Sequence, residues 1–143
     1  MAQAEIKETL AVDYDKLYET IVKYEDYPEF VSGCSEAHVE SRAPGKARVK
    51  YLVNLMKEVS YTLDLSEDRE KGVVEWHLVN SDFMSKNSGR WELRKLGPGK
   101  TEAKYSLELD LKFPVPGFVM NKLVKGSLPA MLRNFEKRAQ GAG

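Results

Sequence analysis

The last quarter of the chain decides the fold: residues 115–139 read VPGFVMNKLVKGSLPAMLRNFEKRA. Apolar side chains recur in this stretch at the 3.6-residue period of an amphipathic helix, and they are Met120, Leu123, Val124, Leu128, Met131 and Phe135. Pro116 and Gly117 mark the start, because proline is tolerated in the first turn of a helix. So long a helix with one apolar side needs a broad concave surface on which to lie.

Pro129 interrupts this pattern. It cannot donate a hydrogen bond to the carbonyl of Lys125, so the sequence predicts a kink near residues 126–129. The apolar stripe keeps its phase across the break, which favours one long bent helix. The alternative is a second helix capped by Ser127.

Before this helix, apolar residues alternate with polar ones. The pattern predicts a first strand at residues 4–12 and further strands at 35–42, 47–55, 59–68, 72–80, 89–96 and 102–113. Short turns such as Pro44-Gly45 separate them, so the pairing should be antiparallel. Two short helices are expected in between, the first beginning at Asp13 as its N-cap and the second at Pro28. The predicted fold class is α+β, with a curved seven-stranded antiparallel sheet wrapped on a long kinked C-terminal helix in one domain, 1–143.

Composition narrows the function classes. Apolar residues make up 42% and charged residues 31% of the chain, and the net charge is zero, so DNA binding is not expected. The sequence has no run of 18 apolar residues and no signal-peptide core in its first dozen residues, so we expect a cytoplasmic protein. The single cysteine, Cys34, allows neither an internal disulfide nor a cysteine-rich metal site.

The predicted inner face of the sheet is rich in aromatic residues, and the helix adds flexible methionines. This composition is typical of a pocket for an apolar ligand, although periodicity shows burial and the same residues can simply fill a core. The candidate ligand-binding residues are Tyr51, Tyr61, Leu63, Trp76, Leu78, Trp91, Tyr105, Leu107, Leu109, Met120, Val124, Leu128 and Met131. Apolar residues in the connections at 54–58 and 81–88 mark either a portal or an irregular strand end.

Catalytic patterns are missing from the sequence. His38 and His77 fall on the outward side of their strands, and no Ser/His/Asp set, paired inward carboxylates or metal-ligand spacing can be assembled. Cys34 has no cationic neighbour in the sequence and is interpreted as a small buried residue. We therefore predict no catalytic residue, no metal and no cofactor.

Three stretches carry a family resemblance: Tyr27-Pro28-Glu29-Phe30-Val31-Ser32-Gly33-Cys34, then 78–83 (LVNSDF) followed by Gly89-Arg90-Trp91, and finally 135–139 (FEKRA). Their order and spacing resemble the START-like polyketide cyclase/dehydrase superfamily, closest to its coenzyme-Q-binding and ribosome-association-toxin branch. The resemblance implies a helix-grip fold that holds an apolar ligand between sheet and C-terminal helix. Pro114-Val115-Pro116-Gly117 and Pro129 depart from that branch, whose last helix is more apolar and aromatic.

Three functions are compatible with this resemblance. The first is binding or transport of a lipid, isoprenoid quinone or polyketide-like molecule without catalysis. The second is a polyketide aromatase/cyclase or dehydratase in which inward tyrosines position the substrate. The third is a regulator that acts on the ribosome. A basic helix face formed by Lys122, Lys125, Arg133 and Lys137 is either a contact for an anionic membrane or for the ribosome, or a solvated surface.

Overall fold

The computed structural model describes residues 2–55, 57–124 and 128–141. In chain order the elements are β1 (Ala2–Leu10), α1 (Tyr14–Val22), the 3-10 helix η1 (Tyr24–Glu29), β2 (Cys34–Ala43), β3 (Lys46–Leu55), β4 (Lys57–Asp68), β5 (Val73–Ser81), β6 (Met84–Gly97), β7 (Lys100–Leu111), α2 (Gly117–Val124) and α3 (Leu128–Gly141). The α+β fold class, the strands and the two short helices after β1 are confirmed, but the second helix begins at Tyr24 and contains Pro28, so the prediction that it begins at Pro28 is wrong.

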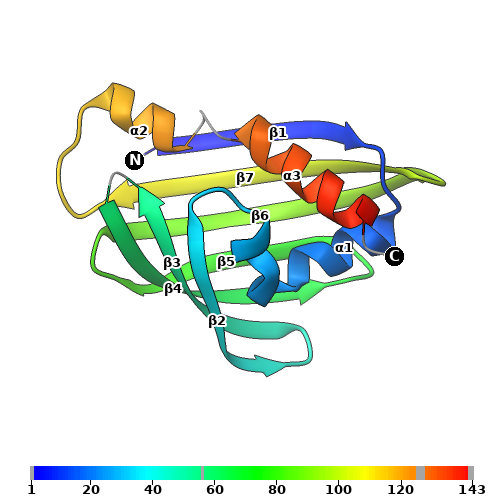
Figure 1. Cartoon of the computed structure of the whole chain (residues 1–143), viewed down its shortest axis with the longest axis horizontal. Coiled ribbons are helices and arrows are strands. Elements are labelled where there is room, and N and C mark those ends of the chain that lie inside the picture. The colour runs from blue at the N-terminus through cyan, green and yellow to red at the C-terminus, as the bar shows by residue number, and fades with distance from the viewer. Residues whose placement is uncertain (1, 56, 125–127, 142–143) are drawn as a thin grey trace.

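The strands form one antiparallel sheet in the order β1-β7-β6-β5-β4-β3-β2 (Figure 1). Strand β1 pairs out of sequence order, against β7, and the other strands each pair with their neighbours along the chain. Register shifts interrupt the β2–β3, β4–β5 and β6–β7 ladders. Such bulges increase local twist and bend a sheet, which is how this one becomes concave.

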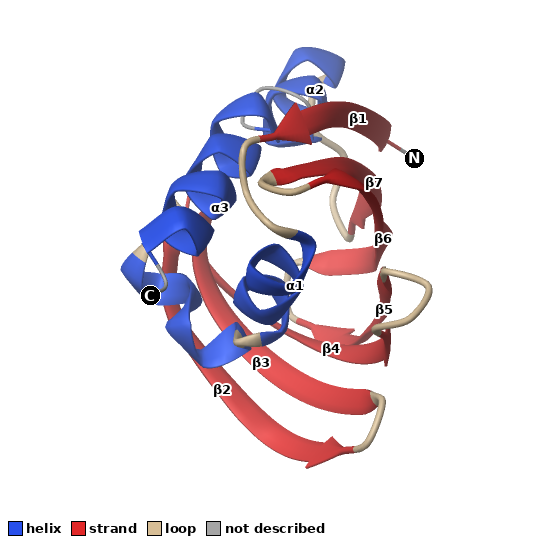
Figure 2. Ribbon diagram, turned by 90° about the vertical axis from the view of Figure 1, so that its right-hand side faces the viewer, coloured by secondary structure: helices blue, strands red, loops and turns tan. Residues whose placement is uncertain are grey.

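Figure 2 shows α1 and α3 on the concave side of the sheet, with α2 beside its β1 edge. Helix α3 packs on α1 and on β1. Leu17 and Ile21 of α1 and Leu132 and Phe135 of α3 are at most 2% exposed. Burial of each such side chain contributes roughly 1.5–3 kcal/mol, so this contact fixes α3 over the sheet.

The C-terminal stretch forms two helices. Residues 125–127, where α2 is joined to α3, lie outside the described residues, as does part of the predicted kink. Pro129 occupies the first turn of α3, where its missing N–H has no intrahelical acceptor to lose. Helix α2 contacts β1 and β7, and its Phe118 is 76% exposed, so α2 does not continue the buried face of α3.

Asp13 lies at the N-cap of α1 with an extended backbone, as predicted, but its carboxylate does not cap that helix. Its Oδ1 accepts a hydrogen bond of 2.7 Å from the backbone N–H of Gly99, in the β6–β7 turn. The buried hydroxyl of Thr101 donates to the carbonyl of Val12 at 2.9 Å. These two bonds tie the β6–β7 hairpin to the start of α1.

The prediction of a connection at 81–88 is wrong, because most of this stretch belongs to a strand. Strand β6 already begins at Met84, and Phe83 and Met84 are only 4% and 3% exposed. Both side chains therefore belong to the core, and the backbone of Met84 pairs with that of Leu111 in β7. None of the described helices is both long and apolar enough to cross a membrane.

Candidate functional site

A cavity of about 210 Å³ lies between the concave face of the sheet and α3. The sequence-predicted residues that line it are Tyr51, Tyr61, Leu63, Trp76, Trp91, Tyr105, Leu107, Leu109, Leu128 and Met131. The inner face is therefore hollow rather than completely filled. The cavity is smaller than the roughly 300–1,000 Å³ of ordinary small-molecule sites.

Three candidate residues are not placed at the cavity. Leu78 is half-buried against the core beside the register shift between β4 and β5, where a bulge re-aims side chains. Met120 does not line the cavity, because α2 packs on β1 and β7 instead of continuing α3. The side chain of Val124 lies outside the described residues.

The cavity has further lining residues that were not among the candidates. Val53, Leu65 and Val74 are apolar positions of predicted strands and Phe135 belongs to the helical stripe, so periodicity predicted burial of these four but not their place at the cavity. The others do not occupy apolar positions of those patterns, and they are Tyr24, Tyr27, Val31, Ser32, Gly33, Cys34, Asn54, Met84 and Asn87. The only sequence signal for the lining residues near η1 was the group of aromatic residues around Pro28. No pattern marked Asn87, which lies in a stretch without clear alternation.

Phe135 of α3 closes one end of the cavity with a cluster of perpendicular ring contacts. Its ring centroid lies 5.3 Å from Tyr27, 5.0 Å from Phe30 and 5.1 Å from Trp91. Edge-to-face pairs of this kind add about 0.5–1.5 kcal/mol beyond area burial. The cluster joins η1, β6 and α3 and holds the cavity wall in place.

Trp76 lies across the middle of the sheet, over Gly89. Its indole Nε1 donates to Oδ1 of the buried Asn87 at 3.1 Å, and its ring is 5.4 Å from Tyr105. Because Trp76 and Gly89 are direct partners across β5 and β6, only a residue without a side chain leaves room for the indole. Gly89, within the sequence Ser88-Gly89-Arg90, therefore allows the Trp76 indole to form part of the aromatic wall.

Exposed lining residues mark the mouth of the cavity. Ser32 and Gly33 come from the connection after η1, and Asn54 comes from the end of β3. The carbonyl of Gly33 accepts a 2.8 Å hydrogen bond from the Asn54 N–H, and the φ of Gly33 is 83°, a conformation that favours glycine. Asn54 belongs to the predicted portal at 54–58, whereas Met56 and the side chain of Leu55 lie outside the described residues.

Tyrosine hydroxyls are the main polar groups of the interior. Those of Tyr51, Tyr61 and Tyr105 make no hydrogen bond within the described part of the chain, whereas the Tyr27 hydroxyl donates to the carbonyl of Ile21 at 2.5 Å. Burial raises the pKa of all four phenols, and neighbouring tyrosines raise the pKa of Tyr51 further. These groups stay protonated and can donate hydrogen bonds.

Charged groups are absent from the described lining of the cavity. His38 and His77 are exposed on the outer side, with side-chain exposures of 67% and 71%. Cys34 is buried, and this burial raises the pKa of its thiol to about 11, so it is not an activated nucleophile. No cluster of three or more His, Cys, Asp or Glu suited to a metal occurs among the described residues.

The expected basic face is partly neutralised by ion pairs. Arg133 pairs with Glu8 of β1 and with Glu136 at 3.1 Å. Lys122 and Lys137 are exposed, and Lys125 lies outside the described residues. Contacts of this face with an anionic membrane or with the ribosome stay predictions.

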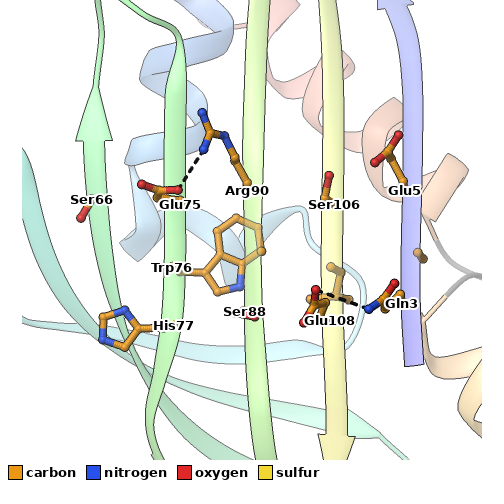
Figure 3. A pocket seen from close by; sticks show the side chains of 13 residues that line it. Gln3, Glu5, Ser66, Glu75, Trp76, His77, Ser88, Arg90, Ser106 and Glu108 are labelled. Carbon is orange, nitrogen blue, oxygen red and sulfur yellow. Dashed lines mark hydrogen bonds and ion pairs between the residues drawn. The ribbon is translucent and has the colours of Figure 1, made fainter. Parts of the chain in front are cut away.

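A second, larger hollow of about 680 Å³ lies on the outer face of the sheet (Figure 3). Two pairs of its charged and polar side chains bond to one another: Arg90 pairs with Glu75 at 3.2 Å, and Gln3 donates to Glu108 at 3.5 Å. The hollow is open, and charged side chains of both signs line it. The smaller inner cavity, with its apolar walls and its inward tyrosine hydroxyls, is therefore the better candidate site.

Comparisons with known proteins agree with this architecture. The model of a family described as polyketide cyclase/dehydrase and lipid transport matches residues 10–136. No curated protein matches the sequence.

Among solved structures, a START superfamily protein from Mycobacterium smegmatis is 18% identical, with 99% of each chain covered and a TM-score of 0.87. A protein from Thermus thermophilus is also 18% identical, with 99% of each chain covered and a TM-score of 0.85. The Zhui aromatase/cyclase from Streptomyces sp. R1128 is 17% identical, covering 97% of this chain and 86% of that one, with a TM-score of 0.72.

At these identities the solved structures establish the fold, and the coenzyme-Q-binding branch stays a prediction. The family match spans most of the chain, and the helix-grip architecture is shared with these structures. The chain belongs to the polyketide cyclase/dehydrase and lipid transport family.

Proposed function

We propose that this protein binds an apolar small molecule in the cavity between the sheet and α3, as a carrier or binding protein. One observation carries the proposal: a hollow of about 210 Å³ is walled by aromatic and aliphatic side chains in the place where a core would normally close. Protein interiors have few voids larger than a water molecule, so a retained cavity with a mouth at Gly33 and Asn54 favours a guest.

Native mass spectrometry of the freshly purified protein, followed by solvent extraction, tests this proposal directly. A stoichiometric quinone, isoprenoid or acyl compound is the expected result. Protein without any bound mass, together with no uptake of such compounds added afterwards, would contradict it. Trp76 and Trp91 are the two tryptophans of the chain and both line the cavity, so intrinsic fluorescence reports uptake.

A matched pair of substitutions locates the binding site on α3. Met131 lines the cavity, whereas the adjacent Ala130 is exposed. Met131→Asp places a carboxylate against an apolar guest, and we expect it to abolish uptake while circular dichroism shows a retained fold. Ala130→Asp adds the same charge outside and should bind normally. Equal uptake by both variants would place the guest elsewhere.

Polyketide cyclisation or dehydration is the second candidate function. It is supported by Tyr51, Tyr61 and Tyr105, which face the cavity and can orient a reactive chain. Against it stands the missing base, since no carboxylate or imidazole lines the described cavity. Turnover of a poly-β-ketone that falls in Tyr→Phe variants would favour catalysis over carriage.

A carrier needs a surface at which it can collect its ligand, and exposed aromatic residues on α2 and in the segment before it offer one. Phe118 is 76% and Phe113 is 46% exposed, and the ammonium of Lys57 lies 5.8 Å from the Phe113 ring centroid. Apolar rings beside Lys112 and Lys122 suit an anionic lipid surface. Co-sedimentation with anionic vesicles should be lost in Phe118→Ser, and equal binding by wild type and variant would refute this contact.

A further inference from the structure

Three tyrosine hydroxyls inside the cavity have a shared property that separates them from the other buried polar groups. Every fully buried polar side-chain atom in the described part of the chain has a hydrogen-bond partner. The hydroxyls of Tyr51, Tyr61 and Tyr105 make no hydrogen bond there although their residues line the cavity. Their oxygen atoms must therefore be open to the cavity space.

The three phenol groups interact electrostatically with one another. Tyr51 and Tyr61 are direct partners across β3 and β4, and their rings stack at 5.3 Å. Tyr105 approaches from β7, beside Trp76 and Trp91. The presence of Tyr105 raises the pKa of both Tyr61 and Tyr51, although burial is the larger cause for each. The cavity wall thus presents neutral O–H donors from β3 and β4 and from β7.

The chemistry of the lining limits what can accept these hydrogen bonds. No lysine, arginine or histidine lines the described cavity, so a carboxylate or phosphate would be buried without a counter-charge. An uncharged oxygen acceptor has no such penalty and would satisfy hydroxyls that are costly to leave unmatched away from water.

The size of the cavity limits the guest further. An apolar cavity of about 150 Å³ accommodates benzene. The present cavity, at about 210 Å³, has room for one ring and a short substituent without movement of its walls. A long chain could enter only in part, through the mouth.

We propose that the guest is an uncharged molecule whose buried part is about one ring in size and carries a carbonyl-type oxygen, held by the hydroxyls of Tyr51, Tyr61 and Tyr105. This inference rests on the proposed function and adds the substrate class. It predicts that a ketone or a quinone-like head group binds more tightly than a hydrocarbon. It also predicts that a fatty acid does not bind with its carboxylate inside the cavity.

Three probes of nearly equal size test the class: acetophenone, ethylbenzene and benzoate. Dissociation constants are measured from NMR shifts of the two indole N–H resonances, since both tryptophans line the cavity. We expect acetophenone to bind at least about fivefold more tightly than ethylbenzene, as a neutral hydrogen bond allows. Benzoate should bind at least about 100-fold more weakly than acetophenone, because its charge has no partner.

Variants then identify the donors. Tyr61→Phe and Tyr105→Phe should each weaken acetophenone binding by about threefold or more and leave ethylbenzene binding within about twofold. Tyr18→Phe is the matched control, because Tyr18 is a buried tyrosine of α1 that does not line the cavity. It should bind both probes as the wild type does.

The outcomes separate the two proposals. Equal affinity for acetophenone and ethylbenzene, with no effect of the tyrosine variants, would overturn the carbonyl inference and leave cavity binding intact. Benzoate binding as tight as acetophenone binding would overturn the requirement for an uncharged guest. Wild-type indole resonances that respond to none of the probes would instead count against the cavity as a binding site.

Discussion

Gly89→Ala is the substitution whose cost follows most directly from the structure. A Cβ at this position would lie 2.3 Å from Cζ2 of Trp76 and 2.5 Å from the carbonyl oxygen of Ser106. The indole can tilt, but the carbonyl belongs to the β7 backbone that pairs with β6. Tilting the indole also breaks its 3.1 Å hydrogen bond to the buried Asn87.

The expected loss is the sum of two effects. Overpacking in a well-packed core costs typically about 1–3 kcal/mol. An unpaired buried amide and indole N–H cost about 1–3 kcal/mol more, so the free energy of unfolding should fall by roughly 2–6 kcal/mol. Because Trp76 lines the cavity, displacement of its indole should also change the uptake of a guest.

Urea unfolding followed by tryptophan fluorescence measures this loss. Gly97→Ala is the matched control, because Gly97 lies at the end of the same strand and a Cβ there meets nothing within 4 Å. The control should stay within about 0.5 kcal/mol of wild type. A Gly89→Ala protein that unfolds at the same urea concentration as Gly97→Ala would refute the packing argument.

Three further predictions concern stability and the interior. Thr101→Val removes the buried hydroxyl bonded to the Val12 carbonyl and should cost about 1–3 kcal/mol in urea unfolding; an unchanged midpoint would show that this bond does not matter. Burial raises the pKa of Tyr61 and Tyr105 above 10.0, so the folded state retains protons that the unfolded state releases. Stability should therefore be constant just below pH 10 and fall above it by up to about 1.4 kcal/mol per pH unit for each such tyrosine, as measured by unfolding at increasing pH; a flat profile would contradict the burial of these phenols. With its pKa raised from 9.0 to about 11, the Cys34 thiol should react with thiol reagents at pH 8 roughly 100-fold more slowly in the folded protein than in urea, and equal rates would show that it is accessible.

Local pattern was sufficient for the elements themselves. Alternation at Val59-Ser60-Tyr61-Thr62 predicts a half-buried strand, and the structure places these residues in β4. Short polar turns force neighbouring strands to pair, so most of the sheet order follows from the sequence. The helical stripe through Leu128 and Phe135 predicts a cover for the sheet, and both residues are buried on α3.

Other features were decided by contacts between residues far apart in the chain. Met120 shares the helical period of Met131 but does not line the cavity, because α2 contacts β1 and β7, whereas α3 contacts α1 and β1. The carboxylate of Asp13 prefers a backbone N–H of the distant β6–β7 turn to its own helix.

The sequence by itself therefore determined that this chain has an aromatic inner face covered by an amphipathic helix, because burial follows from periodicity along a strand or helix. Only the tertiary structure decided that this face encloses an empty volume, that Tyr27, Asn87 and Phe135 complete its wall, and that three tyrosine hydroxyls remain open to it. The physical reason is that emptiness and hydrogen-bond satisfaction depend on sheet curvature and on which side chains meet across the fold, and neither quantity is encoded in the local spacing of apolar residues.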